Sequence, residues 1–144
     1  MKIAEVMSRD VQIASPDQSI ASAARVMMEI DAGSLPVGEN DRLVGVLTDR
    51  DIAVRAVAKE MPPTTKVRDV MSAEVLYCYD DQTLDEVARN MADQQLRRLP
   101  VLDRDKRLVG IVSLADLARN GSTTVVGRAV TGISEPGGEH SQAH

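Results

Sequence analysis

The chain has 144 residues, which suit one ordinary domain or two very small ones. Its hydrophobic fraction of 43% allows a buried core, and this core is aliphatic because the sequence has two Tyr and no Trp or Phe. The net charge of −5, with basic residues scattered among acids, argues against a DNA-binding face, and a single cysteine excludes an intrachain disulfide or a multi-cysteine zinc site.

The N-terminus lacks the features of an export signal. MKIAEVMSRD has an acid at position 5 and no long apolar segment. No apolar run approaches the ~18 residues needed to span a bilayer. We therefore expect a cytoplasmic protein without membrane contact.

The sequence repeats itself at a shift of 64 residues, which becomes 65 after the polar turn at 103–107. The matched pairs include VMS at 6–8 and 70–72, LPV at 35–37 and 99–101, and LVG at 43–45 and 108–110. An ordered match of this kind predicts two copies of one structural unit. Since about sixty residues bury little surface alone, we expect the copies to pack as one pseudo-twofold α+β domain.

Each copy begins with a β-rich stretch, at 11–13 and 75–77, and continues into an amphipathic helix. Apolar side chains recur along one face of each helix: Ile20, Ala23, Ala24, Met27 and Met28 in the first, and Leu84, Val87, Ala88, Met91 and Ala92 in the second. Thr83 followed by Glu86 predicts a capping box at the second helix. We interpret the methionines as core residues.

A short strand at 35–37 or 99–101 comes next, and a polar turn leads into LVGVLT at 43–48 or LVGIVS at 108–113. A second helix, over 49–59 or 114–120, ends the copy. The predicted order is therefore β-α-β-β-α in each repeat, with helices on one face of short strands.

The repeats are expected to span 3–60 and 67–120, joined by an extended, proline-containing linker at 61–66. Residues 121–144 are expected to form a docking helix at 122–133 and a mobile tail. His140 and His144 lie in this tail and are not assigned as ligands or catalytic bases. Cys78 is expected to be a small buried residue.

Two interpretations exist for the aspartates that follow the repeated strands. Thr48-x-x-Asp51 and Ser113-x-x-Asp116 both fit a capping box at a helix start. The alternative is ligand binding, because the carboxyl ends of strands are where open α/β structures hold ligands. A carboxylate can accept both hydroxyls of a vicinal diol such as ribose. One side chain has enough acceptor positions for both roles.

The chain resembles a CBS (cystathionine-β-synthase-type) domain pair, or Bateman module. The family pattern appears as GSLPV with LVGVLTDRD and as RRLPV with LVGIVSLAD, and the resemblance covers about residues 3–120. It implies tandem repeats packed as one Bateman module whose clefts bind adenosyl ligands. These are AMP, ADP or ATP, with NAD or S-adenosylmethionine as further candidates and Mg²⁺ only together with ATP.

The resemblance also implies a set of nucleotide-binding residues. Asp51 and Asp116 would hold ribose hydroxyls, and Thr48 and Ser113 would support ribose or phosphate. The residues expected to flank adenine are Val11, Ile13, Val75, Leu76 and Tyr77. Those expected nearby, in the LP motifs, are Ser34, Leu35, Pro36, Arg98, Leu99 and Pro100. The cations expected near phosphates are Arg50, Arg97 and Arg98. For each arginine, a solvated surface charge is the alternative.

The leading hypothesis is a regulatory module that senses adenine nucleotides and has no catalysis of its own. No catalytic residue or metal ligand is assigned, because the sequence offers no nucleophile–base pair, Walker loop or metal cluster. The alternative is a structural dimerisation module with vestigial clefts, whose aspartates only cap helices. By resemblance we expect a homodimer and an effector protein that the sequence does not identify.

Overall fold

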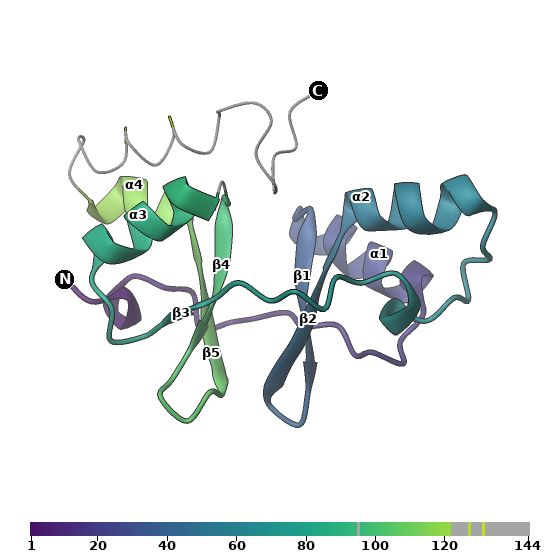
Figure 1. The fold of residues 1–144 in the computed structure, drawn as a ribbon, viewed down its shortest axis with the longest axis horizontal. Coiled ribbons are helices and arrows are strands. Elements are labelled where there is room, and N and C mark those ends of the chain that lie inside the picture. The colour runs from purple at the N-terminus through teal and green to yellow at the C-terminus, as the bar shows by residue number, and fades with distance from the viewer. Residues whose placement is uncertain (95, 122–126, 128–130, 132–144) are drawn as a thin grey trace. The chain divides into compact units, whose positions relative to one another are not determined.

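The structure is a computed structural model that describes residues 1–94, 96–121, 127 and 131 (Figure 1). The chain divides into two compact units. We call residues 12–75 the middle unit, and residues 1–11 with the described residues from 76 onward the terminal unit. Within the described residues, no helix has the length and apolar character that a membrane span requires.

The middle unit consists of one helix, one hairpin and a series of helical turns. Helix α1 precedes the hairpin β1–β2, whose strands pair antiparallel from Ser34 with Thr48 to Glu39 with Arg42. Asn40 and Asp41 form the connection, and both have positive φ, as a tight hairpin turn requires. The elements are α1 (Ile20–Ile30), β1 (Ser34–Glu39), β2 (Arg42–Thr48), α2 (Asp49–Asp51), η2 (Ile52–Ala56), η3 (Val57–Lys59) and η4 (Val67–Asp69).

Helix α1 forms where the apolar spacing predicted it. The Ser19 hydroxyl accepts a hydrogen bond from the Ser22 amide, and the helix ends at Asp31, which has a left-handed conformation. The predicted apolar face is only partly correct, because Met28 is 74% exposed. At 100° per residue, position 28 is turned by about 40° from position 24, which places it beyond the edge of the buried stripe.

The core of the middle unit is aliphatic, as the composition predicted. Side chains from α1 pack on the hairpin and on the helical turns after it: Ala14, Ile20, Ala23, Met27, Leu35, Val37, Leu47, Ala56, Val67 and Val70. The helix expected over 49–59 is helical throughout but irregular, since a short α turn passes into a π segment and then a 3₁₀ turn.

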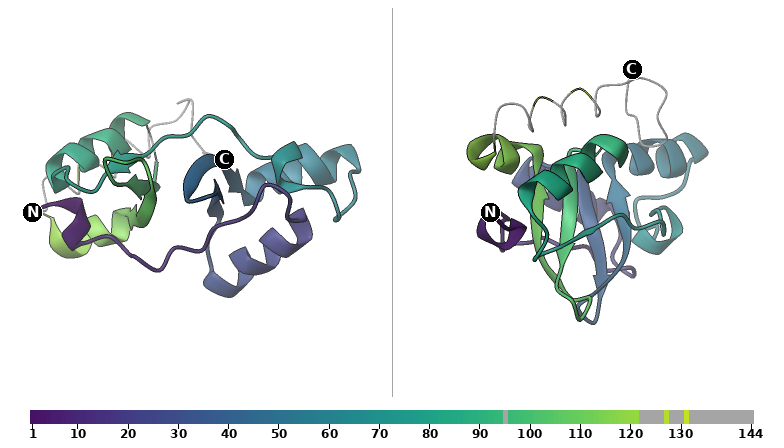
Figure 2. Two further views of the ribbon diagram at one scale, coloured as in Figure 1. Left: turned by 90° about the horizontal axis from the view of Figure 1, so that it is seen from below. Right: turned by 60° about the vertical axis from the view of Figure 1, so that its left-hand side comes forward.

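The terminal unit repeats this arrangement. β3 pairs parallel with β4, β4 pairs antiparallel with β5, and α3 and α4 contact each other (Figures 1 and 2). The elements are η1 (Ile3–Glu5), β3 (Cys78–Tyr79), α3 (Leu84–Gln94), β4 (Arg98–Leu102), β5 (Leu108–Ser113) and α4 (Leu114–Asn120). The α+β class and the repeated β-α-β-β-α order are thus confirmed. The helix predicted at 114–120 matches α4.

The core of the terminal unit has the same character. It consists of Ile3, Met7, Cys78, Leu84, Val87, Ala88, Met91, Leu99, Val101, Val112 and Leu117. Cys78 is buried, as expected, and its thiol lies 3.8 Å from the Pro100 carbonyl oxygen. The Thr83 hydroxyl accepts from the Glu86 amide at 3.2 Å, which agrees with the predicted cap of α3.

The strands predicted at 11–13 and 75–77 are wrong in position. Neither segment is in a strand; Ala14 forms a single parallel bridge with Val37, and β3 begins at Cys78. Only one or two residues in each copy reach the hairpin edge. The β-branched residues before them therefore do not pair with a neighbouring strand, and their strand propensity is not sufficient to form a strand.

The two VMS segments each join the hairpin of the other sequence copy. Ser8 exchanges two backbone hydrogen bonds with Ile111 of β5, at 2.8 and 2.9 Å, and Ser72 exchanges two with Val46 of β2, both at 2.9 Å. Figure 2 shows the N-terminal segment, in purple, beside the green elements of the terminal unit. Each compact unit therefore contains the leading segment of the copy whose hairpin it lacks.

The predicted linker at 61–66 belongs to the middle unit and contains a turn. The Thr65 amide donates to the Pro62 carbonyl at 3.0 Å, and the Thr65 carbonyl accepts from the Ile20 amide at 2.8 Å. The helix expected over 122–133 lies outside the described residues except for Gly127 and Thr131. The tail at 134–144, with His140 and His144, lies wholly outside them.

Candidate functional site

In the middle unit, three predicted site residues meet at one end of the β1–β2 hairpin. Ser34 pairs with Thr48 across the strands, and Asp51 follows in the first turn of α2. The Asp51 amide donates to Thr48 Oγ1 at 2.9 Å, while Asp51 Oδ2 accepts from the Thr48 amide at 3.0 Å. This reciprocal capping box fixes the carboxylate at the point where the strand becomes a helix.

The second carboxylate oxygen of Asp51 has no part in the cap. Asp51 Oδ1 lies 3.8 Å from Arg55 Nε, a distance of an ion pair rather than a close hydrogen bond. The Asp51 side chain is 15% exposed. One oxygen therefore remains as an acceptor for a further partner.

The terminal unit has the same arrangement at the end of the β4–β5 hairpin. Arg98 pairs with Ser113, the Asp116 amide donates to Ser113 Oγ at 3.2 Å, and Asp116 Oδ2 accepts from the Ser113 amide at 2.9 Å. Asp116 Oδ1 accepts from the Arg119 guanidinium, and Asp116 is 7% exposed. Asp116 is thus more fully engaged by the protein than Asp51 is.

The capping interpretation of both aspartates is confirmed by these hydrogen bonds. It does not exhaust the acceptor capacity of either carboxylate, since each ionised oxygen has two lone pairs. Asp51 and Asp116 are therefore pre-positioned carboxylates, and whether they also bind a diol stays a prediction.

The LP motifs contribute their side chains to the cores. Leu35 and Leu99 are fully buried, and Pro36 and Pro100 are buried beside them. The Pro36 carbonyl accepts from the Ala14 amide at 2.9 Å. These residues therefore belong to the cores, and a direct contact with a ligand stays a prediction.

The residues predicted to flank adenine are divided between the units. Ile13 and Val75 belong to the middle unit, whereas Val11, Leu76 and Tyr77 belong to the terminal unit. Ile13 is 48% exposed, and the other four are half-buried. Partial exposure of apolar side chains is compatible with a ligand contact.

The predicted phosphate-binding cations, Arg50, Arg97 and Arg98, are exposed. The carbonyl of Arg97 accepts from the Leu114 amide at 2.9 Å, which places this arginine at the same hairpin end as Ser113. Among the described residues, no acidic group pairs with the guanidinium of Arg97 or Arg98. Both charges are available to an anion.

A charged aromatic cluster in the terminal unit was not predicted. The Arg104 guanidinium lies 4.0 Å from the centre of the Tyr79 ring and donates to both oxygens of Asp81 at 2.7 Å. Tyr77 meets Tyr79 edge-on, with ring centres 5.5 Å apart. Arg104 comes from the turn at 103–107, so the chain distance hides this contact from a local pattern.

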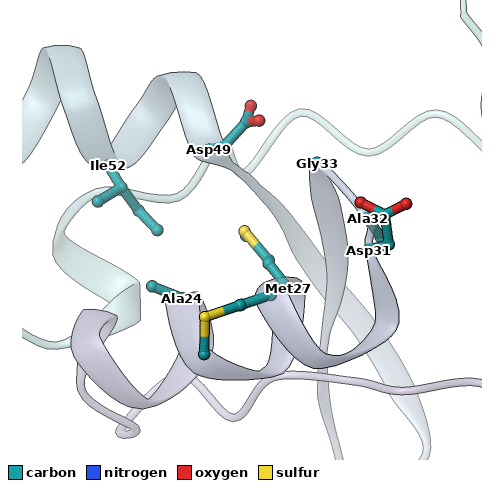
Figure 3. Close-up of a pocket in the computed structure, with 8 residues that line it drawn as sticks. Ala24, Met27, Asp31, Ala32, Gly33, Asp49 and Ile52 are labelled. Carbon is teal, nitrogen blue, oxygen red and sulfur yellow. The ribbon is translucent and has the colours of Figure 1, made fainter.

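A pocket of about 350 Å³ lies in the middle unit, next to the predicted site (Figure 3). Its lining is Ala24, Met27, Met28, Asp31, Ala32, Gly33, Asp49 and Ile52. Figure 3 shows the Asp49 carboxylate directed away from Ile52. None of these residues is in the predicted set, but Gly33 and Asp49 are chain neighbours of Ser34 and Arg50.

A metal centre has no support in the part of the chain that the structure describes. No group of three His, Cys, Asp or Glu side chains there is arranged to hold an ion.

Comparison with known proteins identifies the repeats. The CBS domain profile matches residues 3–57 and 67–122. The CBS domain-containing protein YhcV of Bacillus subtilis is 41% identical over 133 residues, covering 92% of this chain and 94% of YhcV. Hypoxic response protein 1 of Mycobacterium tuberculosis is 34% identical over 134 residues, covering 92% and 93%. Both relatives are therefore of similar length to this chain.

Solved structures show the same fold. The CBS domain protein TA0289 of Thermoplasma acidophilum superposes with a TM-score of 0.78 at 25% identity, over 92% of this chain and 75% of that one. The CBS pair of MJ0100, in complex with 5′-methylthioadenosine and S-adenosyl-L-methionine, gives 0.71 at 28% identity, covering 83% and 94%. CBSX2 in complex with AMP gives 0.72 at 26% identity, covering 82% and 93%.

Proposed function

Because the chain belongs to the CBS-domain family, we propose that it is a regulatory module that binds an adenosyl ligand and has no catalysis of its own. The ligand is AMP, ADP or ATP, with NAD and S-adenosylmethionine as further candidates, and Mg²⁺ binds only together with ATP. Ligand binding shifts the population of conformations that an effector protein recognises. We place this sensor in the cytoplasm, as a homodimer.

One observation carries the proposal: the capping box at each hairpin end uses one carboxylate oxygen, and the second oxygen takes no part in the cap. In both units the cap uses Oδ2, so Oδ1 can accept from a ribose hydroxyl. The adenosyl ligands in the structures of MJ0100 and CBSX2 support the choice of ligand class.

The test is isothermal titration of the wild-type chain and of Asp51→Asn and Asp116→Asn with AMP, ATP, NAD and S-adenosylmethionine. Asparagine keeps an oxygen for the Thr48 or Ser113 amide but replaces the second oxygen by a donor and removes the charge. A charge-assisted hydrogen bond contributes roughly 1.5–3 kcal/mol, so each substitution should weaken its own site by about tenfold to a hundredfold.

Asp93→Asn is the matched control, because Asp93 is exposed on α3 and belongs to neither capping box. It removes the same charge and should leave every affinity unchanged. Wild-type affinities that survive both Asp51→Asn and Asp116→Asn would contradict the ribose role.

The second candidate function is a structural dimerisation module. The complete capping boxes favour it, because they account for both aspartates without a ligand. This candidate predicts no heat of binding with any of the four ligands. Light scattering would then show a dimer whose mass and stability do not depend on nucleotide.

A further inference from the structure

The two hairpin ends share one backbone hydrogen bond but differ in their charged side chains. The Asp49 amide donates to the Gly33 carbonyl at 2.9 Å, and the Leu114 amide donates to the Arg97 carbonyl, also at 2.9 Å. These bonds show that Gly33 and Arg97 occupy equivalent places, as do Asp49 and Leu114. Side-chain chemistry at these places is therefore the main difference between the two ends.

In the middle unit, the Asp49 carboxylate gives the hairpin end a negative charge. Asp49 Oδ2 lies 3.1 Å from the position that a Cβ atom on Gly33 would take, and Asp49 Oδ1 accepts from the Arg50 amide at 2.8 Å. The carboxylate is thus held above Gly33, two residues before Asp51 in the chain. Arg55 is the ion-pair partner of Asp51, and Arg50 is the other exposed arginine at this end.

The pocket beside Gly33 extends this acidic character. Its lining residues include Asp31 and Asp49 beside the apolar Met27 and Ile52, and no lysine or arginine among the described residues (Figure 3). Such a lining repels a phosphate and accepts an uncharged or cationic apolar group.

In the terminal unit, Arg97 and Arg98 occupy the places of Gly33 and Ser34, and the uncharged Leu114 occupies that of Asp49. Arg97 and Arg98 are exposed and have no acidic partner among the described residues, whereas Asp116 is already paired with Arg119. A guanidinium binds phosphate oxygens through parallel N–H donors, so this end favours a phosphate next to the diol.

We propose that the two units select different adenosyl ligands. The terminal unit binds phosphate-bearing ligands such as AMP and ATP, and the middle unit binds phosphate-free ligands, either neutral or cationic. Arg97 and Arg98 determine the first preference, and Asp49 determines the second. This inference rests on the proposed function, since it assumes that both aspartates bind ribose.

The first experiment removes the phosphate preference. In Arg97→Ala/Arg98→Ala, titration with AMP and ATP should show affinity lower by about tenfold or more, because two charge-assisted contacts are lost. The affinity for 5′-methylthioadenosine, which has no phosphate, should stay within about twofold of the wild type. Arg89→Ala/Arg107→Ala is the control, because it removes the same charge from α3 and from the turn before β5.

The second experiment transfers the preference to the middle unit. Gly33→Arg/Ser34→Arg/Asp49→Leu gives this end the residues of its counterpart. The backbone tolerates the change, because φ of Gly33 lies outside the left-handed region and the atoms nearest its Cβ position belong to the Asp49 side chain. We expect the variant to bind a second equivalent of ATP and to lose affinity for 5′-methylthioadenosine.

The outcomes separate this inference from the function on which it rests. If neither AMP, ATP nor 5′-methylthioadenosine binds the wild-type chain, both the proposed function and this inference are overturned. If the ligands bind and Asp51→Asn and Asp116→Asn weaken them, but the arginine and transfer variants keep the wild-type preference, only this inference is overturned. Loss of ATP affinity in the arginine variant alone, with the control unchanged, supports it.

Discussion

Gly110→Ala tests how the N-terminal segment is held on β5. A Cβ atom on Gly110 would lie 2.5 Å from Met7 Sδ and 2.9 Å from the backbone oxygen of Ser8. The methionine side chain can move, but the Ser8 oxygen is part of the backbone that pairs with Ile111. The substitution must therefore push the segment away from β5.

The expected loss of stability combines two contributions. Overpacking of a well-filled core costs typically 1–3 kcal/mol, and each of the two hydrogen bonds between Ser8 and Ile111 contributes about 0.5–1.5 kcal/mol when lost. We expect the free energy of unfolding to fall by about 2–6 kcal/mol. Urea denaturation followed by circular dichroism measures this change.

Hydrogen exchange locates the change, because the amides of Ser8 and Ile111 each donate to the other residue. Both should lose protection in Gly110→Ala while amides of the middle unit keep theirs. Gly45→Ala is the counterpart, with Cβ 2.7 Å from Met71 Sδ and 2.8 Å from the Ser72 oxygen. It should expose the amides of Val46 and Ser72 instead.

Gly127→Ala is the control, because no atom of the described residues lies within 4 Å of its Cβ position, and it should not destabilise the protein. A Gly110→Ala protein with wild-type stability and intact protection of Ser8 and Ile111 would refute the reasoning.

Two further predictions concern titratable groups. Burial, and then the charge of Asp80, raise the pKa of the Cys78 thiol from 9.0 to about 12, so a thiol reagent at pH 8 should react far more slowly with the folded than with the urea-unfolded chain. The unfolded chain loses this thiol proton at lower pH than the folded chain, so the free energy of unfolding should also fall as the pH rises above 9.0 toward 12. Equal reaction rates of the folded and unfolded chains would contradict the burial of the thiol. The hydrogen bonds from Arg104 lower the pKa of Asp81, so Arg104→Ala should return it toward 3.8 in a carbon-13 NMR titration. Since this folded-state pKa is depressed, the small contribution of the ion pair is present above 3.8 and lost as the pH falls through the lowered value.

The helices and hairpins could be predicted because their signals are local. The spacing of Ile20, Ala23 and Met27 is sufficient to define the buried face of α1. The two capping boxes were also visible as short motifs, and their hydrogen bonds form as expected. In each case the interacting residues lie within one or two turns of each other.

Pairing across the chain could not be predicted from the same patterns. VMS occurs at both 6–8 and 70–72, so its sequence does not show which hairpin each segment joins. Arg104 contacts Tyr79 and Asp81, which lie more than twenty residues earlier in the chain. In the sequence, the turn that carries Arg104 indicated only the change in the repeat shift. Leu35 and Leu99 lie in strands whose residues are buried one after another, and not only at every second position.

Each VMS segment pairs with the hairpin of the other sequence copy, and this pairing determines where the protein can be divided into fragments. A fragment that follows the repeat, residues 3–60, would leave Val46 of β2 without Ser72, whereas residues 12–75 would keep this contact. An ancestral single copy with this architecture would complete its sheet edge only by domain swapping with a second molecule. Tandem duplication would then have turned a swapped dimer into one continuous polypeptide.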